Sequence, residues 1–304
     1  MLDFIQQASL NTQDFDKKIE FLYNGILAKN MITLCYADGG NGKSWLAFAL
    51  AKHCVKNGLT TIYCDFDNPL TVLKDRNIDE LLIKPHNNNL SYVQRGKSNH
   101  TPSELLELLN EQATGKKYSD HVIFIDSLRN FCNVNNDLQA MQTMNILMNI
   151  REAGATIVIL HHSNKDGKNY QGSNNIRNSV DNMYQVIKLD SKEQEIKLHL
   201  KVKKERCSIT DCAINIKAND LSIKMLDTEL ATMKTEEETF VNTVKQALTD
   251  NKTQNKGQLL KTAGKEKTDK TARNWLDKYE NKYWTSKKES GVFNYTLLKT
   301  GATK

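Results

Sequence analysis

The sequence lacks three features that would place the protein in a membrane, in a secretory pathway or among disulfide-stabilised domains. No apolar run in the 304 residues approaches the roughly 20 that a membrane-spanning helix requires. The N-terminus, Met1–Gln7, lacks the basic-then-apolar order of a signal peptide, so we expect a cytoplasmic location and no membrane partner. The six cysteines form no C-x-x-C pair, and Cys35, Cys64 and Cys132 lie in or beside apolar segments. We therefore expect reduced core thiols and not zinc ligands or disulfides.

The sequence also lacks a net positive charge over most of its length. Residues 251–304 contain 13 Lys plus Arg against 5 Asp plus Glu, a balance of +8, so the first 250 residues sum to −2. This local excess indicates that the C-terminal segment contacts a polyanion. The hydrophobic fraction of 39% and the charged fraction of 26% are typical of a globular protein with room for one large α/β domain and a small appendage.

The strongest motif lies at residues 37–45, between an apolar strand-like segment that begins at Met31 and a helical segment that continues to Ala51. The pattern Ala-x-x-x-x-Gly-Lys-Ser fits a phosphate-binding loop with alanine in place of the first glycine. A glycine turn before a chance lysine is the alternative, but the flanking strand and helix favour nucleotide binding. The residues expected to contact nucleotide are Ala37, Asp38, Gly39, Gly40, Asn41, Gly42, Lys43, Ser44 and Trp45.

The chemistry of a triphosphate explains these residue types. Glycines let backbone N–H groups curl around phosphate, and the dipole of the following helix favours the same negative charge. Lys43 is expected to reach the β- and γ-phosphates, and the Ser44 hydroxyl to ligate Mg²⁺.

Strands alternate with helices up to about residue 190, which predicts a parallel sheet with right-handed crossovers. Residues 121–128 read as a continuous apolar strand that is closed by Asp126. This carboxylate is the natural partner of the Mg²⁺ held by Ser44. A capping role for Asp126 is the alternative. After Asp190 the pattern changes to antiparallel hairpins.

A second polar region follows the strand at residues 156–162. His161 and His162 are adjacent and point to opposite faces, so we expect one to be buried and the other to face the site. Residues 163–181 form either a mobile surface loop or a loop whose Lys165, Lys168 and Arg177 face phosphate, with a short helix opening at residues 172–173.

The phosphate-binding loop and four other segments together resemble the motifs of RecA-fold ATPases. These are Asp67-Asn68-Pro69, Asp126-Ser127-Leu128, His161-His162-Ser163-Asn164-Lys165 and Gly172-Ser173. The similarity covers roughly residues 15–225 and is closest to the RepA type of hexameric replicative helicase, which is related to DnaB. It implies ATP and Mg²⁺ as cofactors, a hexameric ring and single-stranded DNA as the track.

The resemblance also implies roles for individual residues. Asp67 occupies the position of the carboxylate that activates water, where the family usually has glutamate, so slower hydrolysis is expected. His162 matches the residue that senses the γ-phosphate. Lys204 and Arg206, which alternation places on one side of a strand, match a pair that a neighbouring subunit supplies to the phosphate. Solvation of an exposed basic strand is the alternative for that pair.

Residues 236–300 follow the order helix, helix, turn, helix and hairpin, which predicts a winged helix. Such a domain contacts duplex DNA or another protein. The residues of this domain expected to contact DNA are Lys267, Lys270, Thr271 and Arg273 on or beside the third helix, and Lys287 and Lys288 at the wing. In the core, Lys165, Lys168 and Arg177 are also expected to contact DNA.

We therefore predict an α/β, RecA-like core with a mainly parallel sheet at 31–226. A helical segment (1–30) precedes it, and a linker (227–238) and a winged-helix domain (239–304) follow it. The predicted function is an ATP-dependent helicase or translocase for plasmid, phage or mobile-element replication, with an initiator or a primase as a further partner. The alternative is a DNA-binding regulator or loader that uses ATP as an assembly switch. A small-molecule kinase is weaker, because no lid or acceptor pocket is evident.

Overall fold

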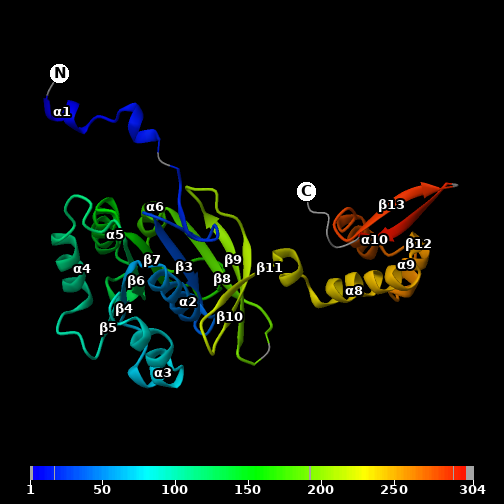
Figure 1. Ribbon diagram of the computed structural model, residues 1–304, viewed down its shortest axis with the longest axis horizontal. Coiled ribbons are helices and arrows are strands. Elements are labelled where there is room, and N and C mark those ends of the chain that lie inside the picture. Colours follow the sequence, from blue (N-terminus) through cyan, green and yellow to red (C-terminus); the bar gives the residue numbers. More distant parts are fainter. Residues whose placement is uncertain (1–2, 17, 192, 290, 299–304) are drawn as a thin grey trace. The chain divides into compact units, whose positions relative to one another are not determined.

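The computed structural model of the protein describes residues 3–16, 18–191, 193–289 and 291–298. The chain divides into two units, Met1–Ala231 and Thr232–Lys304, and each is described by itself below (Figure 1). The division falls within the predicted linker. That segment is not extended, because α7 (Thr228–Ala231) lies inside it and α8 begins at Thr235.

Unit 1 is built on a nine-stranded sheet in which the six strands from β8 to β5 are mutually parallel. The remaining three strands are antiparallel. The spatial order is β11 (Ile223–Leu226), β10 (Cys212–Lys217), β9 (Glu195–Lys204), β8 (Asn182–Lys188), β3 (Ile32–Ala37), β7 (Thr156–His162), β6 (His121–Asp126), β4 (Thr60–Asp65) and β5 (Leu90–Gln94). The predicted α/β class with a mainly parallel sheet is confirmed. Strand β8 was not predicted, although its parallel pairing with β3 completes the centre of the sheet.

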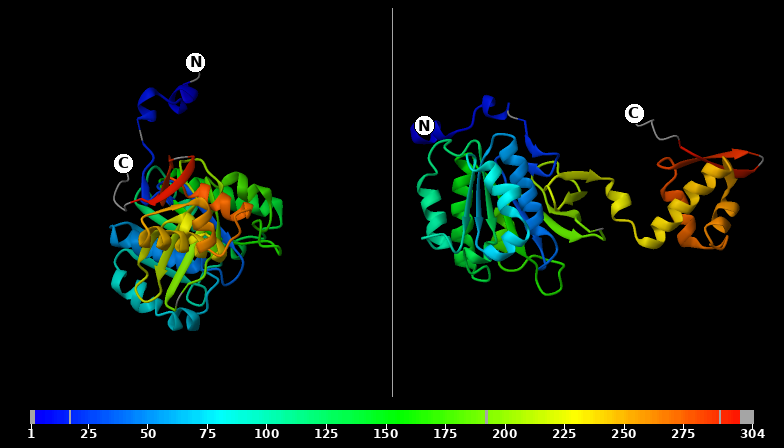
Figure 2. Two further views of the ribbon diagram at one scale, coloured as in Figure 1. Left: turned by 90° about the vertical axis from the view of Figure 1, so that its right-hand side faces the viewer. Right: turned by 60° about the horizontal axis from the view of Figure 1, so that its bottom comes forward.

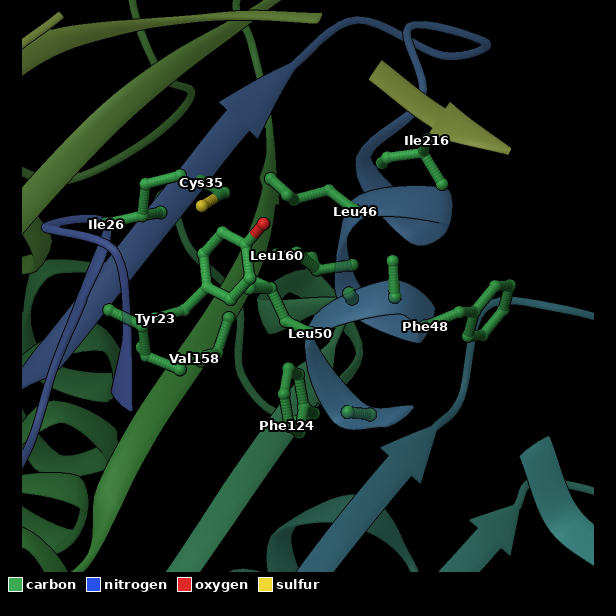
Figure 3. Close-up of a cluster of buried hydrophobic side chains, with 14 of the residues drawn as sticks. Tyr23, Ile26, Cys35, Leu46, Phe48, Leu50, Phe124, Val158, Leu160 and Ile216 are labelled. Atoms are coloured by element: carbon green, nitrogen blue, oxygen red, sulfur yellow. The ribbon is translucent and has the colours of Figure 1, made fainter. Parts of the chain in front are cut away.

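Helices cover both faces of this sheet (Figures 1 and 2). Residues that alternate along a strand face different helices: Val158 and Leu160 of β7 pack with α2, whereas Ile157 and Ile159 pack with α5. Figure 3 shows the first of these clusters. The helices of unit 1 after β3 are α2 (Lys43–Lys56), α3 (Leu70–Asp75), η2 (Asp79–Ile83), η3 (Lys84–His86), α4 (Pro102–Glu111), η4 (Leu128–Asn130), α5 (Asp137–Glu152) and α6 (Asn174–Ser179), followed by α7.

Strand register decides which side chains meet at the ends of the sheet. Ala37 of β3 is paired with His162 of β7, and Asp65 of β4 is paired with Asp126 of β6. All four residues lie where parallel strands end, and we call this side the carboxyl edge. The opposite side, where β3 and β8 begin, is the amino edge. Open α/β sheets bind ligands at the carboxyl edge.

The prediction of a helical segment over residues 1–30 is wrong for its second half. Helix α1 (Asp3–Ala8) and the turn η1 (Thr12–Phe15) are followed by a hairpin of β1 (Phe21–Tyr23) and β2 (Leu27–Ala28). The hairpin turns at Asn24-Gly25, both with positive φ, which is a favoured two-residue turn. Its apolar residues are buried against α2. The spacing of apolar residues that suggested a helix is therefore the spacing of the buried residues of a hairpin.

Among its described residues, unit 2 contains three helices and a three-stranded antiparallel sheet around its own apolar core. Trp284 is fully buried in that core, and its indole N–H donates to the Leu276 carbonyl at 2.9 Å. In chain order the elements are α8 (Thr235–Asp250), β12 (Thr253–Asn255), α9 (Lys256–Thr262), α10 (Lys270–Lys278), β13 (Trp284–Glu289) and β14 (Val292–Leu297). The three helices and the hairpin match the predicted order, and β12 is an addition.

Two bulk properties complete the fold. Among the described residues, no helix has the length and apolar character needed to cross a membrane. All six cysteines are free thiols, and all but Cys132 are buried.

Candidate functional site

The loop between β3 and α2 has the backbone shape that its glycines allow. Gly40 and Gly42 adopt φ of 76° and 83°, a region that L side chains rarely enter. A Cβ atom on Gly42 would also lie 2.8 Å from Leu198 of β9, so glycine is required there on two grounds. A Cβ on Gly39 or Gly40 would meet nothing within 4 Å, so the space beside these two residues is open.

Lys43 is held inside this loop. Its ammonium donates to the carbonyl oxygens of Ala37 and Asp38, each at 2.9 Å, and the residue is only 8% exposed. Burial lowers the pKa of Lys43, while the nearby Asp126, Asp67 and Asp38 act in the opposite direction. The ammonium therefore lies in the hollow of the loop with backbone carbonyls as its hydrogen-bond partners.

The other residues of the motif surround this hollow. Ser44 forms a side-chain hydrogen bond with Asp126, and the Asp38 carboxylate accepts the Gly39 N–H at 2.8 Å. Asn41 is partly exposed on the loop. Trp45 is half-buried beside Phe48, with the Arg76 guanidinium 5.5 Å from its ring centroid.

Two buried carboxylates lie side by side at the carboxyl edge. Asp65 and Asp126 are 0% and 2% exposed, and the Asn68 amide donates to both, at 3.1 Å and 3.3 Å. Tyr92 donates to Asp65 at 2.6 Å, and Tyr63 donates to Asp126 at 3.2 Å. Burial, with the neighbouring Asp65 and Asp67, raises the pKa of Asp126 to about 7. Asp126 is therefore a carboxyl group placed where a cation would favour its charged form.

Asp67 lies on the turn after β4 and is held by side chains from two other segments. Arg129 donates to its Oδ1 at 2.9 Å and Asn130 to the same oxygen at 3.4 Å. The His162 Nε2 atom is 3.8 Å from Oδ2, which is too long for a hydrogen bond. Burial acts to raise the pKa of Asp67, but Arg129 and Asn130 more than offset it, and the pKa lies below its usual value.

The two histidines differ as predicted. His161 is fully buried, its Nε2 is 2.6 Å from the Gln171 carbonyl oxygen, and burial lowers its pKa to about 4. His162 faces the loop and Asp67, and burial together with Lys43 and Arg129 lowers its pKa. Within the described part of the chain, the buried Nε2 atom of His162 has no hydrogen-bond partner. An imidazole in that state is available to a group that enters the site.

These residues fit a nucleotide triphosphate with Mg²⁺. The open loop offers backbone N–H groups and one buried ammonium, and Ser44 with Asp126 supplies two oxygen ligands or outer contacts for the metal. In the described ranges no group of three or more His, Cys, Asp or Glu side chains is arranged for a metal. Two protein ligands suffice for Mg²⁺ when phosphates and water complete its shell.

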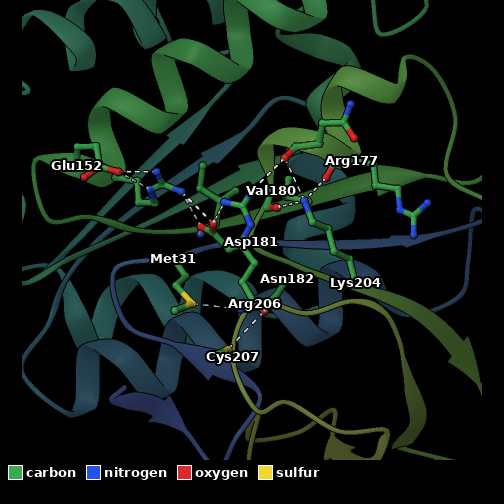
Figure 4. Close-up of polar contacts among 12 residues, drawn as sticks. Met31, Glu152, Arg177, Val180, Asp181, Asn182, Lys204, Arg206 and Cys207 are labelled. Carbon is green, nitrogen blue, oxygen red and sulfur yellow. Dashed lines mark hydrogen bonds and ion pairs between the residues drawn. The ribbon is translucent and has the colours of Figure 1, made fainter. Parts of the chain in front are cut away.

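Lys204 lies at the amino edge, opposite Met183 at the start of β8, and Arg206 follows it. Figure 4 shows both side chains among their polar contacts. The Lys204 ammonium donates to the carbonyl oxygens of Arg177, Asn178 and Val180, at the end of α6. Arg206 donates to Asp181 Oδ1 at 3.0 Å. Six residues of β3 separate this edge from the loop, a span of about 20 Å. Neither side chain can reach the phosphate-binding loop of its own chain.

Arg151 and a backbone amide complete that amino-edge cluster. Arg151 donates to both oxygens of Asp181 at 3.0 Å, and the Ile32 N–H donates to Oδ2 at 2.8 Å. Asp181 is 4% exposed and each of its oxygens has a partner. The cluster anchors the starts of β3 and β8.

The polar loop after β7 is bound to the core by main-chain contacts. Tyr36 donates to the Lys168 carbonyl at 3.1 Å and Gln185 to the Gly167 carbonyl at 2.9 Å. The side chains of Lys165 and Lys168 are exposed. Arg177 instead donates to the Lys203 carbonyl at 3.4 Å, so the structure does not bring the three predicted cations together.

The predicted short helix after this loop is present as α6, with Ser173 as its N-cap. Gly172 is required before it, because a Cβ there would lie 2.4 Å from the Val134 carbonyl oxygen.

The basic residues predicted to contact DNA in unit 2 are all exposed. Thr271 and Arg273 lie on α10, which starts at Lys270 after the Asp269 N-cap. On β13, Lys287 is 3.7 Å from Glu289, and Lys288 lies 5.8 Å from the ring centroid of Phe293, which is half exposed. Lys267 precedes α10.

Sequence reasoning missed several residues that build the site. Asp65 anchors the turn that carries Asp67, since its Oδ1 accepts the backbone N–H groups of Asp67 and Asn68 at 3.1 Å and 2.9 Å. Arg129 and Asn130 follow β6 by three and four residues, so their position just beyond a strand end was a usable signal. Tyr63 and Tyr92, which donate to the two buried carboxylates, gave no signal in the sequence, because aromatic residues inside strands usually belong to the hydrophobic core.

Comparison with protein-family models identifies a family for this chain. A protein-family model described as an AAA domain matches residues 9–168, which is more than half of the chain and includes the loop, Asp67, Asp126 and His162. A search of curated proteins finds none that matches.

Proposed function

The chain belongs to the AAA domain family of P-loop ATPases, and from that premise we propose that it is a ring-forming, ATP-dependent DNA translocase or helicase of the RepA type. The proposal covers a hexamer that moves on single-stranded DNA in plasmid, phage or mobile-element replication, together with an initiator or a primase. The observation that carries it is the convergence of Lys43, Ser44, Asp126, Asp67 and His162 at one edge of the sheet.

Each of these residues has a chemical task in ATP hydrolysis. Lys43 would neutralise the terminal phosphates, and Ser44 with Asp126 would hold Mg²⁺, which supplies further neutralisation of developing charge. Asp67 would orient or deprotonate the attacking water. His162, whose Nε2 atom faces the same space, would contact the terminal phosphate.

The amino-edge position of Lys204 and Arg206 supports a shared site. Because these two side chains lie far from the loop of their own chain, two roles are open to them. They can stabilise the amino edge of their own subunit, and they can stabilise charge on a phosphate bound to a neighbouring subunit. In a ring, every subunit would supply both its own loop and this pair to the next loop. We propose the second role in addition to the first.

The C-terminal unit supports a DNA or replication-protein contact. Its order of α8, β12, α9, α10 and the β13–β14 hairpin fits a winged helix, in which α10 would enter the major groove. Lys270, Thr271 and Arg273 would contact DNA from that helix, and Lys287 and Lys288 from the wing.

The test is ATP hydrolysis by the purified protein with and without single-stranded DNA. We expect DNA to stimulate hydrolysis, and Lys43→Ala to abolish it by removing the ammonium from the loop. Equal rates for wild type and Lys43→Ala would contradict the proposal.

Mixing two inactive variants tests the shared site. Lys43→Ala lacks the loop cation and Arg206→Ala lacks the trans cation, so a mixed ring contains some interfaces with both groups intact. Recovery of hydrolysis on mixing supports the trans role. A mixture as inactive as its components would assign Arg206 to the amino-edge cluster alone.

The alternative is an ATP-switch regulator or replication loader that does not unwind DNA. The specific observation in its favour is the Arg129–Asp67 ion pair, which occupies one oxygen of the shorter carboxylate and lowers its basicity. Strand displacement on a forked duplex separates the two functions, because a switch would bind ATP and DNA and release no strand.

A further inference from the structure

The β13–β14 hairpin, which is the wing of the predicted winged helix, carries an aromatic side chain that the core of unit 2 does not use. Phe293 on β14 is 50% exposed. The hairpin projects past the helices of unit 2, so the ring is accessible from outside (Figure 1). A single exposed apolar residue is ordinary on a protein surface. What the ring can bind therefore depends on the side chains around it.

Strand register sets the side of the sheet on which the ring lies. Lys288 of β13 is the cross-strand partner of Phe293. Paired residues share a face of the sheet, and so does every second residue along a strand. Phe293 therefore shares a face with Tyr295, and Lys288 shares it with Trp284, both of which are buried in the core. Since the Trp284 indole donates to the Leu276 carbonyl on α10, this is the face that carries α10.

Two cations lie on that side. The Lys288 ammonium is 5.8 Å from the ring centroid of Phe293, which is within the range of a cation–π contact. Burial raises the pKa of Tyr295 to about 12, and Arg273 of α10 acts to lower it, so the guanidinium lies close to β14. Within the described part of the chain, neither Lys288 nor Arg273 forms an ion pair. Both cations are therefore available to an anion.

The carboxylates near this corner already have partners. Asp277 of α10 forms an ion pair with Lys256 at 2.8 Å, and Glu280 accepts the Ser286 N–H at 3.1 Å. The corner between α10 and the wing thus combines one open aromatic ring with two available cations. An aromatic ring beside cations is the combination with which proteins bind unpaired nucleotides, because bases stack on the ring and phosphates pair with the cations.

Magnitudes favour an unpaired base over a base inside a duplex. Stacking of a base on an aromatic side chain is worth about 1–3 kcal/mol. Inserting a ring into an intact duplex costs a few kcal/mol, because a base step must be unstacked. The gain from one half-exposed ring does not exceed that cost. A base that is already unpaired stacks on the ring without it.

We propose that Phe293 is a stacking platform for the first unpaired base at a junction of duplex and single-stranded DNA, with Lys288 and Arg273 on the adjoining phosphates. This rests on the proposed DNA contact of unit 2 and adds the feature that the unit recognises, which is a junction and not a continuous duplex. Because a phenyl ring has no hydrogen-bonding group, the stacking carries no base preference.

The first test measures DNA binding by fluorescence anisotropy with the full chain and no nucleotide. Two labelled probes share one duplex sequence, and one of them ends in short unpaired arms. We expect Phe293→Leu to weaken binding of the forked probe by about 5- to 10-fold and to leave the blunt probe unchanged. Phe293→Trp keeps a ring and should bind the fork as wild type does. An equal loss on both probes, or no loss on the fork, would overturn the proposal.

Val292 provides a matched control on the same hairpin. It is 47% exposed and is paired with Glu289, so it lies on the opposite face of the sheet from Phe293. Val292→Ala should leave fork binding unchanged. A loss as large as that of Phe293→Leu would mean that the hairpin acts through its apolar surface in general and not through a stacked ring.

A crosslinking measurement locates the base directly. A 5-iodouracil base at the first unpaired position should crosslink to the peptide that contains Phe293 under ultraviolet light, since this base reacts with an aromatic ring on which it stacks. The crosslink should be absent in Phe293→Leu. A crosslink of equal yield from a paired position inside the duplex would contradict the proposal. Wild type that binds fork and blunt duplex equally would sink this inference alone, whereas wild type that binds neither would sink the proposed DNA contact of unit 2.

Discussion

At the amino edge of the sheet, Asp181 is paired with Arg151, Arg206 and the Ile32 amide. At the carboxyl edge, Asp126 is as deeply buried, but its hydrogen-bond partners are uncharged and its pKa is raised to about 7. The aspartate at the amino edge thus has charged hydrogen-bond partners, whereas the aspartate at the carboxyl edge has uncharged ones. Full pairing is what a structural cluster needs, whereas a ligand site keeps groups available for a molecule that is not part of the chain.

The comparison first predicts a loss of stability at the amino edge. Asp181→Asn removes the charge that compensates two guanidinium groups, so the free energy of unfolding should fall by about 3 kcal/mol. Chemical denaturation of wild type and variant measures this. Asp120→Asn, at an exposed carboxylate 3.9 Å from Lys29, is the matched control and should change stability by less than about 0.5 kcal/mol. A loss for Asp181→Asn as small as that of the control would break the comparison.

The equivalent substitution at the carboxyl edge should act on activity. Asp126→Asn replaces the carboxylate beside Ser44, so we expect Mg²⁺-dependent hydrolysis to fall by about 10- to 100-fold. Stability should be unchanged or higher, because a neutral amide is less costly to bury than a carboxyl group with a raised pKa. Parallel phosphate-release and denaturation measurements test this. Unfolding of Asp126→Asn at a lower denaturant concentration than wild type would contradict it.

The carboxyl edge should also make the protein sensitive to acid. The pKa of His161 is about 4 in the folded chain and about 6.5 when unfolded, so the unfolded state binds the proton more tightly. The contribution of His161 is fully present above pH 6.5 and is lost as the pH falls toward 4, by about 2 kcal/mol between pH 7 and pH 5. Denaturation at both pH values, compared with His161→Phe, isolates this residue. An identical pH dependence in the variant would rule it out.

Arg206 should give the smallest change in stability. Its side chain is 52% exposed and Asp181 retains Arg151, so Arg206→Ala should cost less than about 1 kcal/mol and depend on salt. Denaturation at low and high ionic strength checks this. A larger loss would mean that Arg206, and not Arg151, is the main partner of Asp181.

The two edges were not equally predictable from sequence. The phosphate-binding loop, Asp126 and His162 follow from local patterns, because each ends an apolar strand and parallel strands end together. The amino-edge cluster joins Arg151, Asp181 and Arg206 through strand pairings that no local pattern specifies. The roles of Asp65 and Arg129 likewise depend on which strands are neighbours.

The N-terminal error has a different cause. The spacing of apolar residues at 21–27 was compatible with a helix, but Asn24-Gly25 forms a turn with positive φ, and that local signal decides the structure. In this segment the Asn-Gly turn signal was therefore a better guide to the structure than the spacing of the apolar residues.

Thermal unfolding with a non-hydrolysable ATP analogue and Mg²⁺ tests the central claim most directly, namely that the carboxyl edge is a nucleotide site. Ligand that binds only the folded chain raises its melting temperature. We predict a rise for wild type and also for Asp181→Asn, from a lower starting value, and no rise for Lys43→Ala. A rise that survives Lys43→Ala would contradict the account.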